Sequence, residues 1–105
     1  MKKFSHKFSR AELIDFGRLI TNFLNQQSQT EFALMEFLHA YNLMQMQVKF
    51  HRKFFTTQKT ITMQFDLNEA LAILFLNESF FDVQLREVAA SLHKQMHQDY
   101  SQLFR

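Results

Sequence analysis

The chain contains one glycine and no proline in 105 residues. These two residues mark most turns and helix ends, so the element boundaries must be set by other side chains. Phosphate-binding loops, dinucleotide-binding fingerprints and nucleophile elbows all need glycines at fixed positions, which this chain lacks. The sequence therefore predicts a fold delimited by helix caps, and a protein that is not an enzyme.

Three capping boxes predict where helices begin. In such a box a Ser, Thr or Asp is followed three residues later by Glu, and each residue satisfies a backbone N–H near the other. The three boxes are Ser9 with Glu12, Ser28 with Glu31, and Asp66 with Glu69. Apolar residues recur at helical spacing after each box and again near the C-terminal end. The predicted helices cover residues 9–25, 28–43, 66–76 and 80–103.

The apolar period changes from 3.6 to two residues near position 44. Met44, Met46, Val48 and Phe50 alternate with polar residues, as do Ile61, Met63 and Phe65. Alternation of this kind is typical of strands with one buried face. We predict a hairpin with strands 44–55 and 60–65, joined by a loop over 56–59. Placing Phe50 opposite Phe65 keeps the apolar residues on one face.

These elements predict a single α+β domain over residues 1–105, with four helices around a central antiparallel β-hairpin in the order ααββαα. The N-terminus is a possible third strand, because Phe4 and Phe8 share a face across His6. Gly17 lies beside the apolar stripe of the first helix and predicts a close contact with a second helix. No internal repeat or linker is evident.

Positive charge is concentrated in two stretches, although the formal net charge is only +2. Residues 1–10 and 37–65 hold most of the Lys and Arg residues and no acid, whereas acids outnumber cations from residue 66 onward. The molecule is therefore predicted to be electrically two-sided if these stretches segregate in space.

The sequence predicts no cofactor, no metal site and no catalytic residue. It has no cysteine, which removes disulfides and thiolate ligands. His93 and His97 stand four residues apart, but Lys94 occupies the place of the glutamate in a zinc-protease motif and the ligand set is incomplete. No residue run resembles a targeting signal or a membrane span, so a cytoplasmic location is predicted.

The chain has 14 phenylalanines, and two interpretations are open: some of the rings lie at the surface, or all of them fill an aromatic core. Exposed rings beside cations tend to mark interfaces. We predict a non-enzymatic interaction module that binds a second copy of itself or an acidic macromolecule, with no small-molecule substrate. The predicted partner-binding residues are Lys49, His51, Arg52, Lys53, Phe54, Phe55 and Phe80.

Binding of RNA or DNA by the same hairpin is the alternative. Lys49, His51 and Lys53 would alternate toward one side and neutralise phosphates, and Phe55 would stack on a base. The competing explanation is that lysines on a strand prevent edge-to-edge aggregation. The residues predicted for the nucleic-acid alternative are Lys49, His51, Lys53, Phe55, Lys59, Thr62 and Gln64.

The order strand, helix, turn, helix over residues 60–92 resembles the ribbon-helix-helix arrangement. The resemblance implies that Thr60, Thr62 and Gln64 face base edges. However, the predicted strand 44–55 occupies the edge at which such a ribbon would pair, and the inter-helix turn has no glycine. We therefore do not assign the chain to this family.

Overall fold

The computed structural model describes residues 3–27, 34–79 and 82–99. The elements are β1 (Phe4–Ser9), α1 (Arg10–Gln27), α2 (Leu34–Lys53), β2 (Thr60–Phe65), α3 (Leu67–Ser79) and α4 (Val83–Asp99). Within these ranges the predicted α+β class, with four helices and one two-stranded antiparallel sheet, is confirmed. The predicted order is wrong, because one strand lies near the N-terminus instead of after the second helix.

The segment predicted as strand 44–55 is helical up to Lys53. Leu43, Met46 and Phe50 are fully buried at helical spacing, whereas Met44 and Val48 are 49% and 53% exposed. Over a few residues, a strand and a helix can bury some of the same positions. The alternation of apolar residues therefore does not exclude a helix here. No Gly or Pro interrupts the segment, and its Met, Gln, Leu and Lys residues favour a helix.

The sheet is an antiparallel ribbon of β1 and β2, and β2 has the predicted bounds. The register pairs Phe4 with Phe65, His6 with Met63 and Phe8 with Ile61. The N-terminal segment is thus the partner of β2 and not a third strand. The predicted pairing of Phe50 with Phe65 is wrong, although their ring centroids lie 6.2 Å apart in the core.

A capping box connects each strand directly to the following helix. At the end of β1, the Ser9 N–H donates to Glu12 Oε1 (2.8 Å) and the Glu12 N–H donates to Ser9 Oγ (3.2 Å). At the end of β2, the Asp66 N–H donates to Glu69 Oε1 (2.9 Å) and the Glu69 N–H donates to Asp66 Oδ1 (2.8 Å). Both predicted boxes are confirmed, while the box at residues 28–31 lies outside the described residues.

The fourth helix begins at Val83 after an unpredicted cap, in which Asp82 Oδ1 accepts the Leu85 N–H at 2.9 Å. The bounds predicted for this helix, 80 and 103, lie outside the described residues. None of the helices that the structure describes has the length and apolar character needed to cross a membrane.

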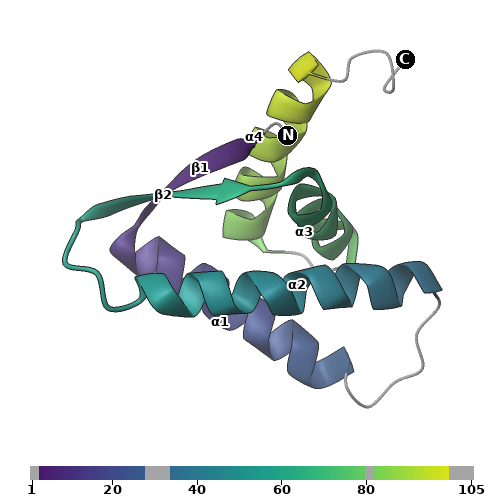
Figure 1. The fold of residues 1–105 in the computed structure, drawn as a ribbon, viewed down its shortest axis with the longest axis horizontal. Coiled ribbons are helices and arrows are strands. Elements are labelled where there is room, and N and C mark those ends of the chain that lie inside the picture. Colours follow the sequence, from purple (N-terminus) through teal and green to yellow (C-terminus); the bar gives the residue numbers. More distant parts are fainter. Residues whose placement is uncertain (1–2, 28–33, 80–81, 100–105) are drawn as a thin grey trace.

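The core lies between the ribbon and the helices. Figure 1 shows the ribbon on one side of the crossed helices α1 and α2, with α4 behind the ribbon and α3 beyond the end of β2. Most phenylalanines with described side chains are buried, including Phe4, Phe8, Phe16, Phe50 and Phe65 at 1% exposure or less. The phenylalanine surplus therefore serves mainly to fill the core, with several tilted or edge-to-face ring contacts.

The order strand, capping box, helix, helix occurs twice along the chain. The first unit contains β1, α1 and α2, and the second contains β2, α3 and α4 (Figure 1). No repeat is evident in the sequence, because apart from the caps and the strand alternation the two units share few residues. The structure therefore corrects that expectation at the level of architecture.

Candidate nucleic-acid interface

One face of the β1–β2 ribbon is exposed to solvent, and we call it the ribbon face. Because side chains alternate along a strand, every second residue points to this side. Its residues, all exposed, are Ser5, Lys7, Ser9, Thr60, Thr62 and Gln64. The ribbon face therefore presents hydroxyls, one amide and one ammonium group to solvent, while the other side of the ribbon packs on the core.

Helices hold both outer edges of the ribbon at the same cross-strand pair. Ser5 lies opposite Gln64. The Ser5 N–H donates to Gln95 Oε1 of α4 (2.9 Å), and Gln95 Nε2 donates to the Ser5 carbonyl (2.7 Å). On the other edge, Lys49 Nζ of α2 donates to the Gln64 carbonyl at 2.7 Å. The ribbon is thus fixed in place from both sides.

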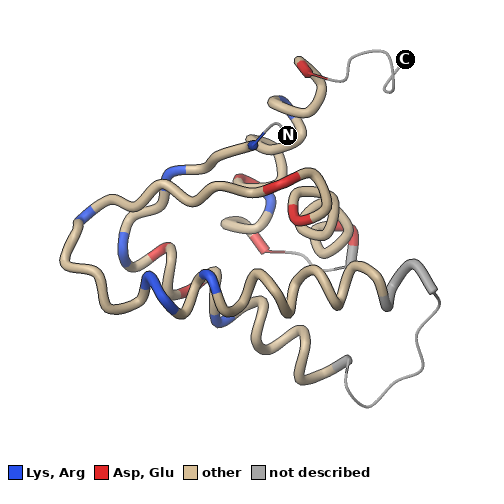
Figure 2. Tube along the Cα trace, in the orientation of Figure 1, with Lys and Arg blue, Asp and Glu red and all other residues tan. Residues whose placement is uncertain are grey.

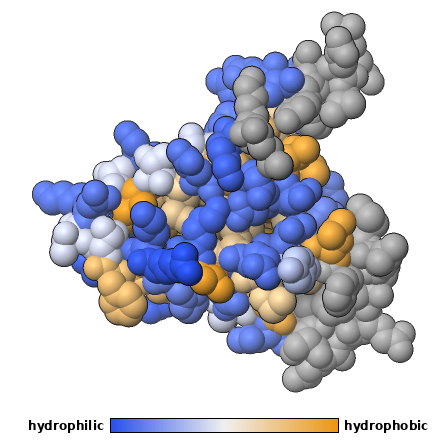
Figure 3. Space-filling view, in the orientation of Figure 1, coloured by the Kyte–Doolittle hydropathy of each residue, from blue (hydrophilic) through white to orange (hydrophobic). Residues whose placement is uncertain are grey.

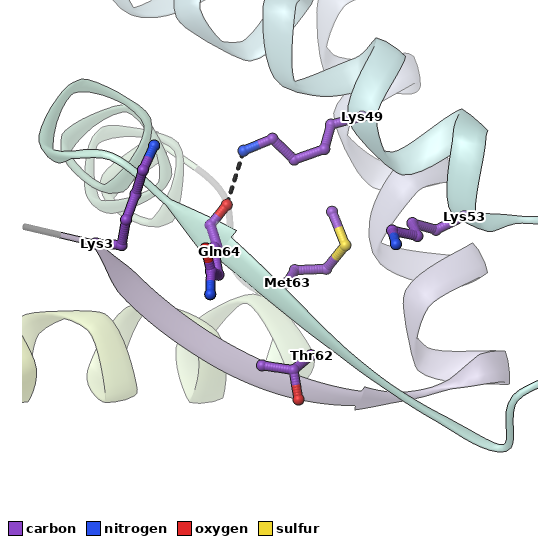
Figure 4. A pocket seen from close by; sticks show the side chains of 6 residues that line it. All are labelled: Lys3, Lys49, Lys53, Thr62, Met63 and Gln64. Atoms are coloured by element: carbon purple, nitrogen blue, oxygen red, sulfur yellow. Dashed lines mark hydrogen bonds between the residues drawn. The ribbon is translucent and has the colours of Figure 1, made fainter.

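Three lysines surround an open hollow of about 310 Å³ along the free edge of β2, which we call the lysine hollow. Lys49 and Lys53 come from α2, and Lys3 precedes β1 (Figure 4). The side chain of Met63 points to the same side of β2 as these lysines, whereas the side chain of Thr62 points to the other side. The lysine hollow therefore lies beside the ribbon face and not within it.

The three ammonium groups differ in their partners. Lys49 Nζ lies 3.0 Å from Glu69 Oε1 and 5.6 Å from the centre of the Phe65 ring. Since Glu69 is only 8% exposed, Lys49 mainly compensates this buried carboxylate. Lys3 and Lys53 have no ion pair within residues 3–27, 34–79 and 82–99. These two cations are the ones available to an external anion.

The two acid-free stretches of the sequence meet at the ribbon. The Arg10 N–H donates to the Lys59 carbonyl at 3.2 Å and so connects the start of α1 to the start of β2. Figure 2 shows Lys and Arg residues along the ribbon and at the C-terminal end of α2, with acidic residues of α1 close to them. In α3, Glu69 lies 3.0 Å from Lys49 of α2, so acidic groups border this basic region. Figure 3 shows that this side of the molecule is mainly hydrophilic, with its hydrophobic residues in separate patches.

The predicted basic residues do not share one face of a strand, because the segment that carries most of them is helical. Lys49 and Lys53 share one side of α2 because they are four residues apart in a helix. His51 therefore does not lie on their side, and its ring packs at 4.9 Å from Phe54. Arg52 is exposed on the last turn of α2, where cations also stabilise the helix dipole. Lys59 is exposed next to the ribbon.

The predicted aromatic residues separate into two groups. Phe54 is half-buried and its ring covers Gly17, so it belongs to the core and not to a contact surface. Phe55 is 88% exposed, as predicted. Phe80 lies outside the described residues. Thr62 and Gln64 are exposed as predicted, but their cross-strand neighbours are Lys7 and Ser5 of β1.

Sequence reasoning missed the contribution of β1 to the site. Ser5 and Lys7 lie on the ribbon face, and Lys3 lines the lysine hollow. The signal was present in the sequence, since Phe4, His6 and Phe8 alternate with polar residues. The predicted strand 44–55 occupied the place beside β2 that β1 takes in the structure, so the sequence indicated β1 only as a possible third strand.

Metal chemistry has no evident site within the part of the chain that the structure describes, where no three His, Asp or Glu side chains are grouped as metal ligands. The rings of His93 and His97 lie 6.4 Å apart. Comparison with protein-family models, with curated proteins and with solved structures finds no match to this chain. The evidence for function is therefore the chemistry of the ribbon face and of the lysine hollow.

Proposed function

We propose that this chain is a non-enzymatic DNA-binding protein that inserts the ribbon face into the major groove of a duplex, with the lysine hollow beside a phosphate. The observation that carries the proposal is a fixed two-stranded ribbon whose polar face is uncovered and whose edge is lined by cations. The proposal also includes a cytoplasmic location for the protein.

The dimensions of the ribbon fit this groove. Neighbouring strands lie about 4.8 Å apart, so a two-stranded ribbon with its side chains fits a major groove that is about 12 Å wide. Each strand has six residues. At about 3.4 Å per residue the ribbon is roughly 20 Å long, which equals the length of about six base pairs.

The side chains of the ribbon face have the chemistry of base readout. Lysine donates hydrogen bonds to the acceptors of guanine, and glutamine both donates to and accepts from adenine. Serine and threonine hydroxyls can do either. Lys7, Gln64 and Thr62 supply these three kinds of group on one exposed surface. Gln95 and Lys49 hold the edges of the ribbon and so keep these groups in a fixed arrangement.

The surrounding cations fit contact with phosphates. Lys3 and Lys53 line the lysine hollow, and Arg10 and Lys59 are exposed near one end of the ribbon. Phosphate contacts of this kind position a protein on DNA without reading sequence. They also make the affinity fall with salt, because each contact releases a counterion from the duplex.

Binding to an acidic protein is the competing function, and self-association through the same surface is less favourable. A symmetric dimer would place the lysine hollow of one copy against basic residues of the other, which costs free energy through repulsion of like charges. An acidic partner avoids this repulsion. It does not require a face of alternating readout groups, so the geometry favours DNA.

The test measures the fluorescence anisotropy of a labelled DNA duplex of random sequence as a function of salt. Lys53→Ala is expected to weaken binding and to lower the slope of log affinity against log salt by about one. The matched control is Arg18→Ala, which removes an exposed cation from the middle of α1 and is expected to leave the slope unchanged.

Two results would contradict DNA binding, and a third would contradict the role of the lysine hollow. The first is a wild-type protein that binds no duplex at low salt. The second is displacement of the duplex by polyglutamate at equal charge, which would favour the acidic-protein interpretation. A slope that responds equally to both substitutions would show that the lysine hollow is not the site of phosphate contact.

A further inference from the structure

The two strands and the capping boxes that follow them are related by an approximate two-fold axis through the ribbon. The same number of residues separates Ser9 from Asp66 and Glu12 from Glu69, so the capping boxes occupy equivalent positions. We call this constant separation the shift, and it assigns each residue of the first strand an equivalent in the second. Both caps make the same reciprocal pair of hydrogen bonds. The equivalence therefore includes the junction between each strand and its helix.

The strand register obeys the same symmetry. The shift that relates the caps carries Phe4 to Ile61, His6 to Met63 and Phe8 to Phe65. The ladder pairs Phe4 with Phe65 and Phe8 with Ile61, so each of these pairs is the symmetry copy of the other. His6 pairs with its own equivalent, Met63. The approximate two-fold axis thus passes between His6 and Met63.

The second helix of each unit holds the strand of the other unit. Lys49 of α2 donates to the carbonyl of Gln64 in β2, and Gln95 of α4 holds both backbone groups of Ser5 in β1. These two contacts lie on one side of the axis, because the equivalent of Ser5 is Thr62 and not Gln64. The symmetry is therefore that of the ribbon backbone and its caps, and it does not extend to the helices that hold the edges.

On the ribbon face, positions that the two-fold axis relates carry different side chains. The shift carries Lys7 to Gln64 and Ser5 to Thr62. Lys7 lies opposite Thr62 on one side of the axis, and Gln64 lies opposite Ser5 on the other side. All four are exposed. A hydroxyl residue is thus present on both sides, but an ammonium group on one side corresponds to an amide group on the other.

We propose that this protein recognises an imperfect palindrome in duplex DNA, with guanine in the half-site under Lys7 and adenine at the equivalent position under Gln64. The inference rests on the proposed function and specifies its ligand. DNA duplexes have local two-fold axes, so an approximately symmetric ribbon places its two sides on two half-sites. Lysine selects the O6 and N7 acceptors of guanine, and glutamine selects N6 and N7 of adenine.

Two single substitutions make the ribbon face symmetric and so test the inference. Gln64→Lys places lysine on both sides, and Lys7→Gln places glutamine on both sides. Each protein is used to enrich sequences from a randomised duplex library, and three duplexes with G and A, G and G, or A and A at the equivalent positions are then compared. Since all the substituted side chains are exposed, folding is checked by circular dichroism and is expected to be unchanged.

The expected result is a change of preference in each variant. Wild type prefers the G and A duplex, Gln64→Lys prefers G and G, and Lys7→Gln prefers A and A, each by about tenfold. The control, Lys94→Gln, makes the same chemical change at an exposed position of α4 that is not part of the ribbon face. It is expected to keep the wild-type preference even if its overall affinity is lower.

The possible failures are distinguishable. If the proteins bind duplex DNA but wild type and both variants share one preference, the imperfect palindrome is wrong and the proposed function stands. If wild type enriches no sequence yet binds duplexes with the expected salt dependence, the ribbon contacts only phosphates and the inference is again wrong. If none of the proteins binds duplex DNA, both the inference and the proposed function are wrong.

Discussion

The single glycine shows how one residue determines the packing of two helices. A Cβ atom at Gly17 would lie 2.6 Å from Cζ and 2.9 Å from Cε1 of Phe54, closer than real atoms approach. Phe54 can cover the core only because α1 has no side chain at this position. The position of Gly17 beside the apolar stripe predicts this close contact, and the structure confirms it.

The effect of Gly17→Ala is expected to depend on residue 54. In the Phe54→Ala background, Gly17→Ala is expected to stabilise the protein by about 1 kcal/mol, because alanine favours the helix and the ring no longer obstructs it. In the wild-type background the clash offsets this gain, since overpacking costs roughly 1–3 kcal/mol. Urea denaturation of the four proteins measures the coupling. Equal effects of Gly17→Ala in both backgrounds would contradict the contact.

At the scale of elements, α2 is the feature that changes the interpretation of the whole chain. The segment was predicted as a strand because Met44, Met46, Val48 and Phe50 alternate. The structure buries Met46 and Phe50 and leaves Met44 and Val48 half-exposed. Met46 and Phe50 would thus be buried in either a strand or a helix. Neighbouring residues therefore decide which of the two structures forms.

Substitutions at two of these positions distinguish a helix from a strand. Met46→Ala is expected to destabilise the protein by about 2–5 kcal/mol, because it empties a fully buried site. Val48→Ala is expected to be neutral or stabilising by about 0.5 kcal/mol, since alanine has the higher helix propensity and Val48 is exposed. Thermal or urea denaturation measures both. Similar losses for the two variants would indicate that both side chains face the core, as in a strand.

Elements whose limits are set by local chemistry could be predicted from the sequence. The starts of α1 and α3 follow from the capping boxes at Ser9 and Asp66, and β2 follows from alternation between polar limits. Strand pairing could not be predicted in the same way, because β1 and β2 are far apart in the sequence and many registers keep apolar residues on one face. The candidate site was consequently predicted with the correct residues of β2 and the wrong partner strand.

The whole molecule is expected to lose stability as the pH falls below the ordinary range of histidine. Burial lowers the pKa of His6, an effect that Glu12 and Glu87 partly oppose. Burial likewise lowers the pKa of His39, against the opposing charge of Glu78. Below pH 6.5 the unfolded chain therefore binds more protons than the folded chain, so the free energy of unfolding decreases as the pH decreases.

Urea denaturation at pH 7.5 and at pH 5.5 measures this decrease, because the two pH values lie on either side of the ordinary histidine pKa of about 6.5. The double variant His6→Gln with His39→Gln is expected to lose less stability between the two pH values than wild type, because neither glutamine binds a proton. Hydrogen bonds from Ser9 lower the pKa of Glu12, so a further loss is expected in both proteins at more acidic pH. Equal losses for wild type and the double variant near pH 6 would contradict the role of the two histidines.

The two strands of the ribbon belong to one covalent chain, and this removes a vulnerability that a ribbon shared between two subunits would have. A shared ribbon comes apart on dilution, since its stability depends on protomer concentration. Here the melting temperature is expected to stay constant across a wide dilution series measured by scanning fluorimetry, and a fall on dilution would contradict a ribbon formed within one chain. The ribbon of this protein would thus stay intact at concentrations so low that a ribbon shared between two subunits would dissociate.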